Sequence, residues 1–295
     1  MRLVTYRQRH VTNAAPRAGA LIEQDVVDLN AANVDLPSHV LSLLQGGLSL
    51  LDQARKAAMG AWERADSSAV RPLADIELLA PIPRPPKIVC IGVNYADHAA
   101  EAGRELPPRP SVFLKAASCV IGPNEPIVRP TTTERLDYEV ELAVVIGRTS
   151  KAVPRDQAME VVAGYTIMND VSARDLQLAK DGGVILGKNF DTAAPTGPCL
   201  ALADEVPDPT NLRLRTWVNG ELRQDGTTSN LIFDIPAIIT FLTQQLTLEP
   251  GDLIATGTPA GVGLGMHPQV WLQPGDIVRM EIEGIGVLEN TVTAG

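Results

Sequence analysis

The sequence predicts an α+β fold rich in strands, in which a mixed sheet is rolled or stacked as a sandwich. Apolar runs with the length of buried strands recur along the chain, whereas helical patterns are few and do not alternate with them regularly. The 295 residues include 24 glycines and 23 prolines, a turn-rich composition that disfavours a helical bundle. With 45% hydrophobic and 20% charged residues, the chain is typical of a globular protein that buries a sizeable core.

Residues 1–70 are predicted to form a small N-terminal α+β domain. Three segments there have a clear period: a strand over 2–7, a hairpin with strands at 20–22 and 26–29, and a helix between Leu51 and Trp62 with Ser49 as its N-cap. The segment 71–87 then holds five prolines, a density that neither a helix nor a central strand tolerates. We therefore expect a linker at 71–87 and a larger domain at 88–295.

The larger domain is predicted to consist mostly of strands. They are expected at 87–93, 142–146, 165–168, 212–218 and 221–224, and after the two Pro-Gly-Asp turns at 250–252 and 274–276. Asn219 and Gly220 predict a tight hairpin turn between two of these strands. Helices are expected at 95–102, 154–163, 172–181 and 235–244.

The charge of the chain argues against several classes of partner. Its 25 Lys and Arg against 35 Asp and Glu give a net charge of −10, which disfavours binding to nucleic acids and to anionic membranes. The sequence contains neither a run of 18 apolar residues nor an apolar signal-peptide core at its start. Widely spaced cysteines without a CxxC pair predict buried thiols in the reducing cytoplasm: Cys90, Cys119 and Cys199.

Two carboxylates precede a buried strand in the segment DYEVELAVVIG (137–147). Glu139 and Glu141 are two residues apart, so on a strand they point to the same face. One interpretation is a solvated edge strand with its acids in water. However, the strand continues into the apolar residues 144–146, and two acids at the mouth of a buried strand require raised pKa values or a cation.

A third acid, Asp170, follows the strand predicted at 165–168. Asp170 or Ser172 is a plausible cap for the helix that begins next, which is a common use of these residue types. Alternatively, Asp170 joins Glu139 and Glu141 in binding a hard divalent cation. Three carboxylates with open positions suit Mg²⁺ or Mn²⁺, which keep waters and take up substrate oxygens.

Three further segments are candidates for the chemistry. His98 and Glu101 are three residues apart on a predicted helix, as a general base and its orienting carboxylate would be, although such pairs are also common on protein surfaces. Lys188 follows an apolar run and is either a site residue or a solvated lysine. The glycine-rich run 256–265 is either a cradle of backbone amides for a carboxylate or a flexible connection.

From residue 88 onward the chain resembles the fumarylacetoacetate hydrolase family, and residues 1–70 resemble the small N-terminal domain of its two-domain, domain-containing members. Five blocks in the same order carry the resemblance: IGVNYADHAAE (91–101), DYEVELAVVIG (137–147), NDVSARDLQ (169–177), GKNFDTAAPTGP (187–198) and PGDLIATGTPAGVG (250–263). The resemblance implies the family's β-rich fold for the larger domain. It also implies a homodimer.

The resemblance assigns roles residue by residue. Glu139, Glu141 and Asp170 match metal carboxylates, Arg174 and Gln177 match residues that contact substrate, Lys188 matches an active-site lysine, Thr258 matches a carboxylate-binding threonine, and His98 with Glu101 matches a dyad on a lid helix. Asn94 stands nearest the place where fumarylacetoacetate hydrolase itself has a fourth carboxylate. This departure argues against fumarylacetoacetate as the substrate.

The resemblance therefore implies an Mg²⁺- or Mn²⁺-dependent hydrolase that cleaves a C–C bond in a small, anionic 2,4-dioxo acid of the acylpyruvate kind. The same enolate chemistry serves a decarboxylase or isomerase of oxaloacetate or of a 2-hydroxymuconate-type dioate, and a hydrolase of 2,4-diketo-3-deoxy sugar acids. A protein with this fold that binds or scaffolds without catalysis is a further alternative, which the complete set of competent side chains disfavours.

Overall fold

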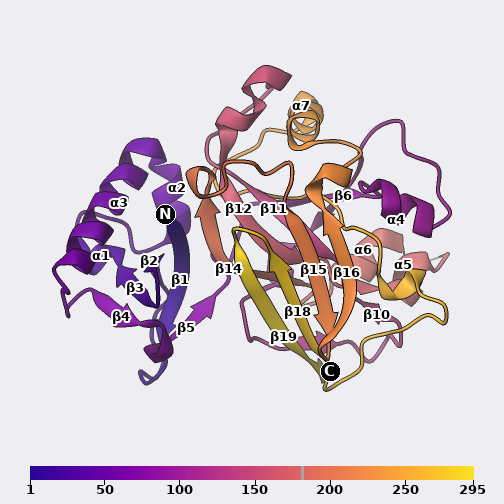
Figure 1. Ribbon diagram of the computed structural model, residues 1–295, viewed down its shortest axis with the longest axis horizontal. Coiled ribbons are helices and arrows are strands. Elements are labelled where there is room, and N and C mark those ends of the chain that lie inside the picture. The colour runs from indigo at the N-terminus through magenta and orange to yellow at the C-terminus, as the bar shows by residue number, and fades with distance from the viewer. Residues whose placement is uncertain (181–182) are drawn as a thin grey trace.

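The computed structural model describes residues 1–180 and 183–295. Strands form a large sheet, a second sheet of five strands and one short two-stranded ladder. Figure 1 shows the N-terminal strands and helices at one side of the molecule and the remaining strands with several short helices at the other. The α+β, strand-rich class predicted from the sequence is confirmed.

The N-terminal part consists of short strands packed against helices. It contains β1 (Arg2–Gln8), β2 (Arg17–Ile22), β3 (Asp25–Asp28), β4 (Val70–Pro72), β5 (Ile76–Leu79), α1 (Leu29–Ala32), α2 (Val40–Gln45) and α3 (Gly47–Glu63). Helix α3 begins before the predicted start, so the N-cap is Gly46 and the expectation for Ser49 is wrong. Ser49 lies inside the first turn of the helix.

The proline-rich segment 71–87 is not a linker throughout. Its first residues complete β4, and β5 pairs antiparallel with β1. Pro72 ends an edge strand of the sheet, where a missing backbone donor is tolerated. The other four prolines lie at 81–86, where the chain has no regular structure. The expected linker is therefore confined to residues 80–87.

One large sheet connects the N-terminal part with the rest of the chain. Its order is β4-β3-β2-β1-β14-β12-β11-β17-β6-β7, with β5 beside β1 and β8 beside β14. The strands not yet given are β6 (Ile88–Gly92), β7 (Ser111–Lys115), β8 (Val120–Ile121), β11 (Val140–Ile146), β12 (Val162–Asn169), β14 (Ala194–Leu202) and β17 (Leu253–Ala255). Strand β1 pairs with β14, and every residue of β11 is buried.

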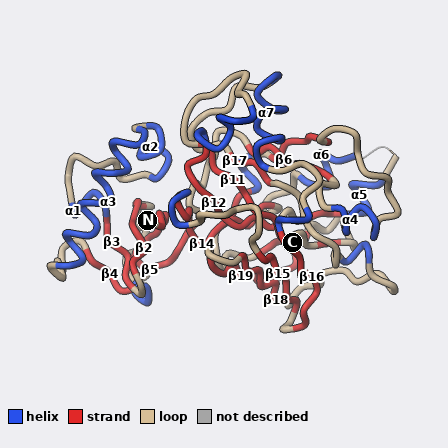
Figure 2. Tube along the Cα trace, turned by 45° about the horizontal axis from the view of Figure 1, so that its top comes forward, coloured by secondary structure: helices blue, strands red, loops and turns tan. Residues whose placement is uncertain are grey.

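A second sheet packs on the large one and completes a sandwich, with β15 against β11, β18 against β12 and β19 against β14 (Figure 2). Its order is β16-β15-β18-β19-β9. The strands are β9 (Ile127–Arg129), β15 (Arg213–Val218), β16 (Glu221–Thr227), β18 (Ile277–Ile282) and β19 (Gly286–Ala294). The predicted hairpin turn is present, and Asn219 and Gly220 both have positive φ, as a tight turn of this kind requires.

Short helices surround the two sheets. They are α4 (Ala96–Glu101), α5 (Arg174–Leu178), α6 (Gly183–Lys188) and α7 (Ile235–Gln245), and β10 (Leu136–Asp137) pairs with β13 (Ser172–Ala173) near α5. The helix predicted over 172–181 is shorter than expected, and its residue 181 lies outside the described residues. None of the helices in the described parts is long and apolar enough to cross a membrane.

Short 3₁₀ helices join many of these elements. They are η1 (Leu73–Asp75), η2 (Ala117–Cys119), η3 (Arg155–Val161), η4 (Ala203–Glu205), η5 (Thr228–Asn230) and η6 (Gly263–Gly265). The α-helix expected over 154–163 is η3 instead. Its buried residues, Ala158 and Val161, are three apart, which is the repeat of a 3₁₀ helix.

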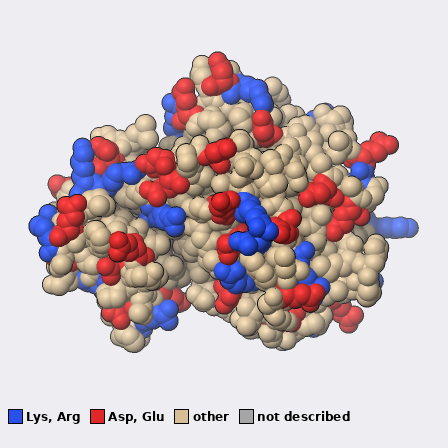
Figure 3. All heavy atoms as spheres, viewed as in Figure 1, with Lys and Arg blue, Asp and Glu red and all other residues tan. Residues whose placement is uncertain are grey.

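The three cysteines are buried free thiols, as expected. At the surface, acidic and basic side chains are interspersed on the face shown in Figure 3, and they gather together over β15 and β18. Arg215 of β15 and Glu281 of β18 form one of these pairs.

Candidate active site

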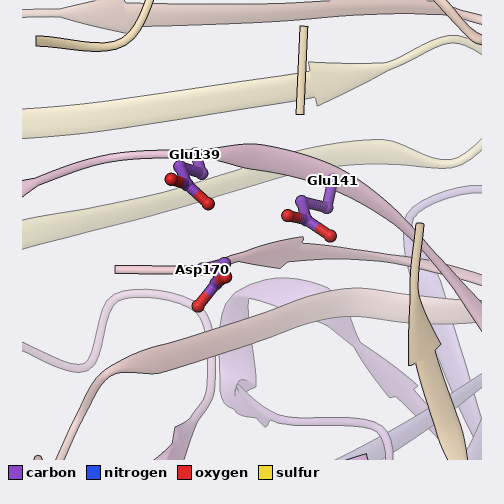
Figure 4. Close-up of side chains that lie close together, drawn as sticks. All are labelled: Glu139, Glu141 and Asp170. Carbon is purple, nitrogen blue, oxygen red and sulfur yellow. The ribbon is translucent and has the colours of Figure 1, made fainter. Parts of the chain in front are cut away.

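Three buried carboxylates meet where β11 and β12 lie side by side. Glu139 directly precedes β11, Glu141 is its second residue, and Asp170 directly follows β12. The two strands are antiparallel with Val140 opposite Asn169, so the acids come from adjacent ends. Ligand oxygens of the three side chains lie within 4.8 Å of one another, and Figure 4 shows the carboxylates facing a common space. The capping alternative fails, because the N-cap of α5 is Ala173.

Basic side chains hold two of the three acids. Lys188 Nζ lies 2.8 Å from Oε2 of Glu139 and 2.6 Å from Oδ2 of Asp170. Arg174 Nη2 donates to Oε1 of Glu139 at 2.7 Å, and Lys115 Nζ donates to Oδ1 of Asp170 at 2.7 Å. Because Lys188 is only 2% exposed, the alternative of a solvated lysine is wrong.

The pKa values of the cluster follow from these ion pairs. Burial alone would raise the pKa of Glu139, but Lys188 and Arg174 outweigh it and lower that pKa. Burial together with the charges of Asp170 and Glu139 raises the pKa of Glu141 well above its usual value. Burial would lower the pKa of Lys188, yet Asp170 and Glu139 raise it, so the ammonium stays charged.

The donor set fits a hard divalent cation. Among the described residues no basic side chain pairs with Glu141, whose Oε2 accepts a hydrogen bond of 2.8 Å from the amide of Gly257. The cluster therefore lacks positive charge on one side, and carboxylate oxygens are the ligands that Mg²⁺ and Mn²⁺ prefer. Asn94 does not extend the set, because its amide is bound to the backbone of Thr256 and Phe233.

The acids line a cavity of about 150 Å³. Every predicted site residue except Glu101 lines it: His98, Glu139, Glu141, Asp170, Arg174, Gln177, Lys188 and Thr258. Glu101 lies behind His98, and the Nδ1 atom of His98 is 3.2 Å from the Oε2 atom of Glu101. The spacing on the predicted helix therefore corresponds to a real pair beside the acids.

The glycine-rich loop holds carboxylates, although they belong to the protein itself. Its amides donate to Glu141 from Gly257, to Glu101 from Gly261 at 2.9 Å and to Asp137 from Gly263 at 2.7 Å. The loop is thus a scaffold for acids rather than a flexible connection.

Two predicted substrate contacts have distinct surroundings. Thr258 Oγ1 accepts a hydrogen bond of 2.8 Å from Gln224, which leaves its hydroxyl hydrogen free to donate into the cavity. The three guanidinium nitrogens of Arg174 donate to Asp137, Glu139 and Gln177. Arg174 therefore positions Glu139 in this structure, and a direct contact between Arg174 and substrate stays a prediction.

The sequence reasoning missed Lys115 and Asp137. Asp137 continues the period-two spacing of Glu139 and Glu141, so the alternation itself was a usable signal. Lys115 and its partner Asp170 are 55 residues apart, and nothing in the spacing of the apolar segment SVFLK marks that lysine. Phe113 of the same strand was also missed, and its ring centroid lies 5.5 Å from Lys188 Nζ.

Known proteins share this arrangement of fold and sequence. The sequence model of the protein family described as fumarylacetoacetate hydrolase C-terminal matches residues 87–293 of this chain. An oxaloacetate tautomerase of cattle (Bos taurus) is 43% identical over 99% of this chain and 91% of its own length. An oxaloacetate tautomerase of Homo sapiens is 42% identical over the same shares.

Solved structures agree with these relatives. A fumarylacetoacetate hydrolase from Exiguobacterium antarcticum has a TM-score of 0.83 at 37% identity, and both chains are covered completely. A maleylpyruvate hydrolase from a Sphingobium species, solved with manganese(II) and pyruvate, has a TM-score of 0.81 at 32% identity, again with both chains covered completely.

One expectation is corrected by these comparisons. The tautomerases of cattle and humans are named as mitochondrial, which contradicts the cytoplasmic location inferred from the cysteines. The inference was wrong because buried free thiols do not separate one reducing compartment from another. The family match and the full-length relatives agree with the five sequence blocks, and the chain belongs to the fumarylacetoacetate hydrolase family of enzymes.

Proposed function

We propose that this protein is an Mg²⁺- or Mn²⁺-dependent enzyme that interconverts the keto and enol forms of oxaloacetate or a closely related 2-oxo acid. The observation that supports it most is that three clustered carboxylates and the His98–Glu101 pair adjoin one cavity. Relatives named oxaloacetate tautomerase, which align over almost the whole chain, support this substrate.

Glu139, Glu141 and Asp170 would hold the cation through their carboxylate oxygens. When bound, Mg²⁺ or Mn²⁺ supplies a Lewis acid that polarises the 2-oxo group and makes the neighbouring C–H bond more acidic. Lys188 keeps Glu139 and Asp170 in place and adds positive charge where negative charge develops on the substrate.

His98 is the group that moves the proton. Tautomerisation transfers one proton between C3 and the oxygen on C2 of the substrate and changes no other σ bond. The Glu101 carboxylate accepts from Nδ1 of His98, which leaves Nε2 as the basic nitrogen. Glu101 is itself fixed by the amide of Gly261, so the imidazole is oriented by a rigid partner.

Thr258 contributes to binding the substrate's carboxylate. Its oxygen already accepts from Gln224, so its hydroxyl hydrogen stays available for an acceptor on the substrate. An anionic 2-oxo acid is thereby oriented with its reacting end at the acid cluster.

Hydrolysis of a 2,4-dioxo acid, the activity expected from the sequence, is the second candidate. The observation in its favour is again the His98–Glu101 pair, because an oriented imidazole also activates water. The neighbour named maleylpyruvate hydrolase, at 32% identity, adds support for a cleavage reaction.

The decay of the oxaloacetate enol, followed by its ultraviolet absorbance, tests the proposal. We expect acceleration with Mg²⁺ or Mn²⁺, none with EDTA, and a rise in melting temperature when either cation binds. Glu139→Gln should weaken Mn²⁺ binding in a direct titration and lower turnover, whereas the exposed control Glu160→Gln should change neither. Parent-like Mn²⁺ binding by Glu139→Gln would reject the metal assignment. Turnover of acylpyruvates without enol decay would favour the hydrolase.

A further inference from the structure

The cavity has one basic lining residue that is not engaged by the protein's own acids. The lysine and arginine residues that line it are Arg104, Arg174 and Lys188. Arg174 and Lys188 are buried and paired with carboxylates. Arg104 is exposed, and within residues 1–180 and 183–295 its guanidinium has neither an ion pair nor a hydrogen bond.

Arg104 is tied to the helix that carries His98. The chain turns at Gly103, whose φ is +61°, and the amide of Arg104 donates to the carbonyl of Ala99 in α4 at 2.9 Å. The exposed Arg104 and the buried acids line the same cavity, so the cavity has an acidic floor and a basic rim.

The rim also has apolar walls. Leu178, Val184 and Leu264 line the cavity together with Arg104. The planar guanidinium fork matches a carboxylate with two parallel donors. An unpaired arginine in such surroundings suits a carboxylate that arrives with a ligand.

We propose that Arg104 binds a second, distal carboxylate of the substrate and so makes the site selective for 2-oxo dicarboxylates over 2-oxo acids with apolar tails. This assignment rests on the proposed function, which places the 2-oxo end of the substrate at the acidic floor. The distal carboxylate then lies toward the rim. Arg104 is a specificity-determining residue in this arrangement and takes no part in proton transfer.

Binding calorimetry with two matched ligands in the presence of Mg²⁺ tests the assignment. 2-Oxoglutarate carries a distal carboxylate, and 5-methyl-2-oxohexanoate has an isopropyl group of the same shape in its place. We expect the parent to bind the dicarboxylate about tenfold more tightly, the size of one charged hydrogen-bonded contact. Arg104→Gln should lose this preference and keep its affinity for 5-methyl-2-oxohexanoate.

Arg109→Gln is the matched control, because Arg109 is an exposed arginine nearby in the chain that does not line the cavity. It should retain the preference of the parent. If both ligands bind and the preference survives in Arg104→Gln, or the parent shows no preference, the role of Arg104 is wrong while the proposed function stands. If the Mg²⁺-loaded parent binds neither ligand, the 2-oxo acid function and the role of Arg104 are both rejected.

Discussion

The backbone amide of Gly257 donates a hydrogen bond of 2.8 Å to Oε2 of Glu141. Gly257 has a φ of +103°, and a Cβ at this position would lie 2.9 Å from Cβ of Asn94, so only glycine presents its amide there without strain. Glu139 and Asp170 are held instead by lysine and arginine side chains. Within the described residues, Glu141 is thus the member of the cluster whose carboxylate is paired with no basic side chain.

Replacing Glu141 with Gln should therefore raise the thermal stability of the metal-free protein and remove the extra stability that a bound metal gives. The neutral amide keeps an oxygen for Gly257 and removes both the cost of burying a charged carboxylate and the repulsion by Asp170 and Glu139, which together raise the pKa of Glu141. In EDTA we expect the melting temperature to rise by about 2–4 °C, which corresponds to about 1 kcal/mol in a chain of this size. The stabilisation by Mg²⁺ should be lost. Thermal melts with EDTA and with Mg²⁺ measure both effects. A lower melting temperature in EDTA, together with the parent's rise in melting temperature on adding Mg²⁺, would contradict the prediction.

A second prediction concerns acid stability in the N-terminal part. Burial would raise the pKa of Asp28, but hydrogen bonds from Arg17, Tyr6 and the amide of Ala31 outweigh it and lower that pKa. The folded-state pKa lies below the unfolded one, so the stabilisation is present above the unfolded pKa and is lost as pH falls through the folded pKa. Asp28→Asn, which keeps a capping side chain for α1, should cost about 1–3 kcal/mol at pH 7 and less near pH 3.

Urea unfolding of Asp28→Asn at both pH values provides the measurement. Asp35→Asn is the control, because Asp35 is exposed and close in the chain. It should leave stability unchanged at either pH. An equal loss at pH 7 and pH 3 in Asp28→Asn would show that packing, rather than the ionised carboxylate, is the source of the stabilisation.

The parts of the site that could be predicted are those in which residues close in sequence share one face of a strand or a helix. Alternation on a strand places Glu139 and Glu141 on one face, and helical spacing places His98 beside Glu101. The contact between Lys115 and Asp170 depends on the pairing of whole strands, which neither short segment specifies. For the same reason the glycine-rich loop could be predicted to bind a carboxylate, but not which one.

The fold shows the same division. Hairpin partners such as β15 and β16 are local, and the Asn219-Gly220 turn between them fixes their register. The pairing of Leu3 in β1 with Leu200 in β14 joins residues almost two hundred positions apart, so no periodicity in the sequence predicts this pairing. Residues 76–79 likewise form β5 because they pair with β1, although the prolines of the surrounding stretch favour a linker.

The homodimer implied by the family resemblance is a third prediction. Strand β7 is an edge of the large sheet, and its Val112 and Leu114 are 40% and 54% exposed. An exposed apolar edge strand is a surface that natural proteins usually cover. Sedimentation equilibrium at micromolar concentration should give twice the chain mass of 31.5 kDa. Leu114→Lys should weaken the dimer, whereas Leu48→Lys, at an 85% exposed site in the N-terminal part, should not. A mass near that of one chain would reject the prediction.

The last prediction separates the chemistry of His98 from that of the cation. Tautomerisation requires a base for the proton on C3, whereas decarboxylation of oxaloacetate leaves the electron pair of the broken C3–C4 bond on C3 and requires none. His98→Ala should therefore lower tautomerisation, and any acylpyruvate hydrolysis, about 10²–10⁴-fold, the usual effect of a positioned acid–base group. Decarboxylation and Mn²⁺ binding should persist.

Glu101→Gln should show a smaller defect than His98→Ala, because it disturbs the orientation of the imidazole held through the 3.2 Å contact and leaves the ring in place. The measurement is a paired assay at saturating Mg²⁺, with enol decay and pyruvate release followed on the same preparation of each variant. Equal loss of both activities in His98→Ala would mean that His98 orders the cavity rather than moving a proton. Unchanged enol decay would remove His98 from the reaction and transfer the role of base to another group in the cavity.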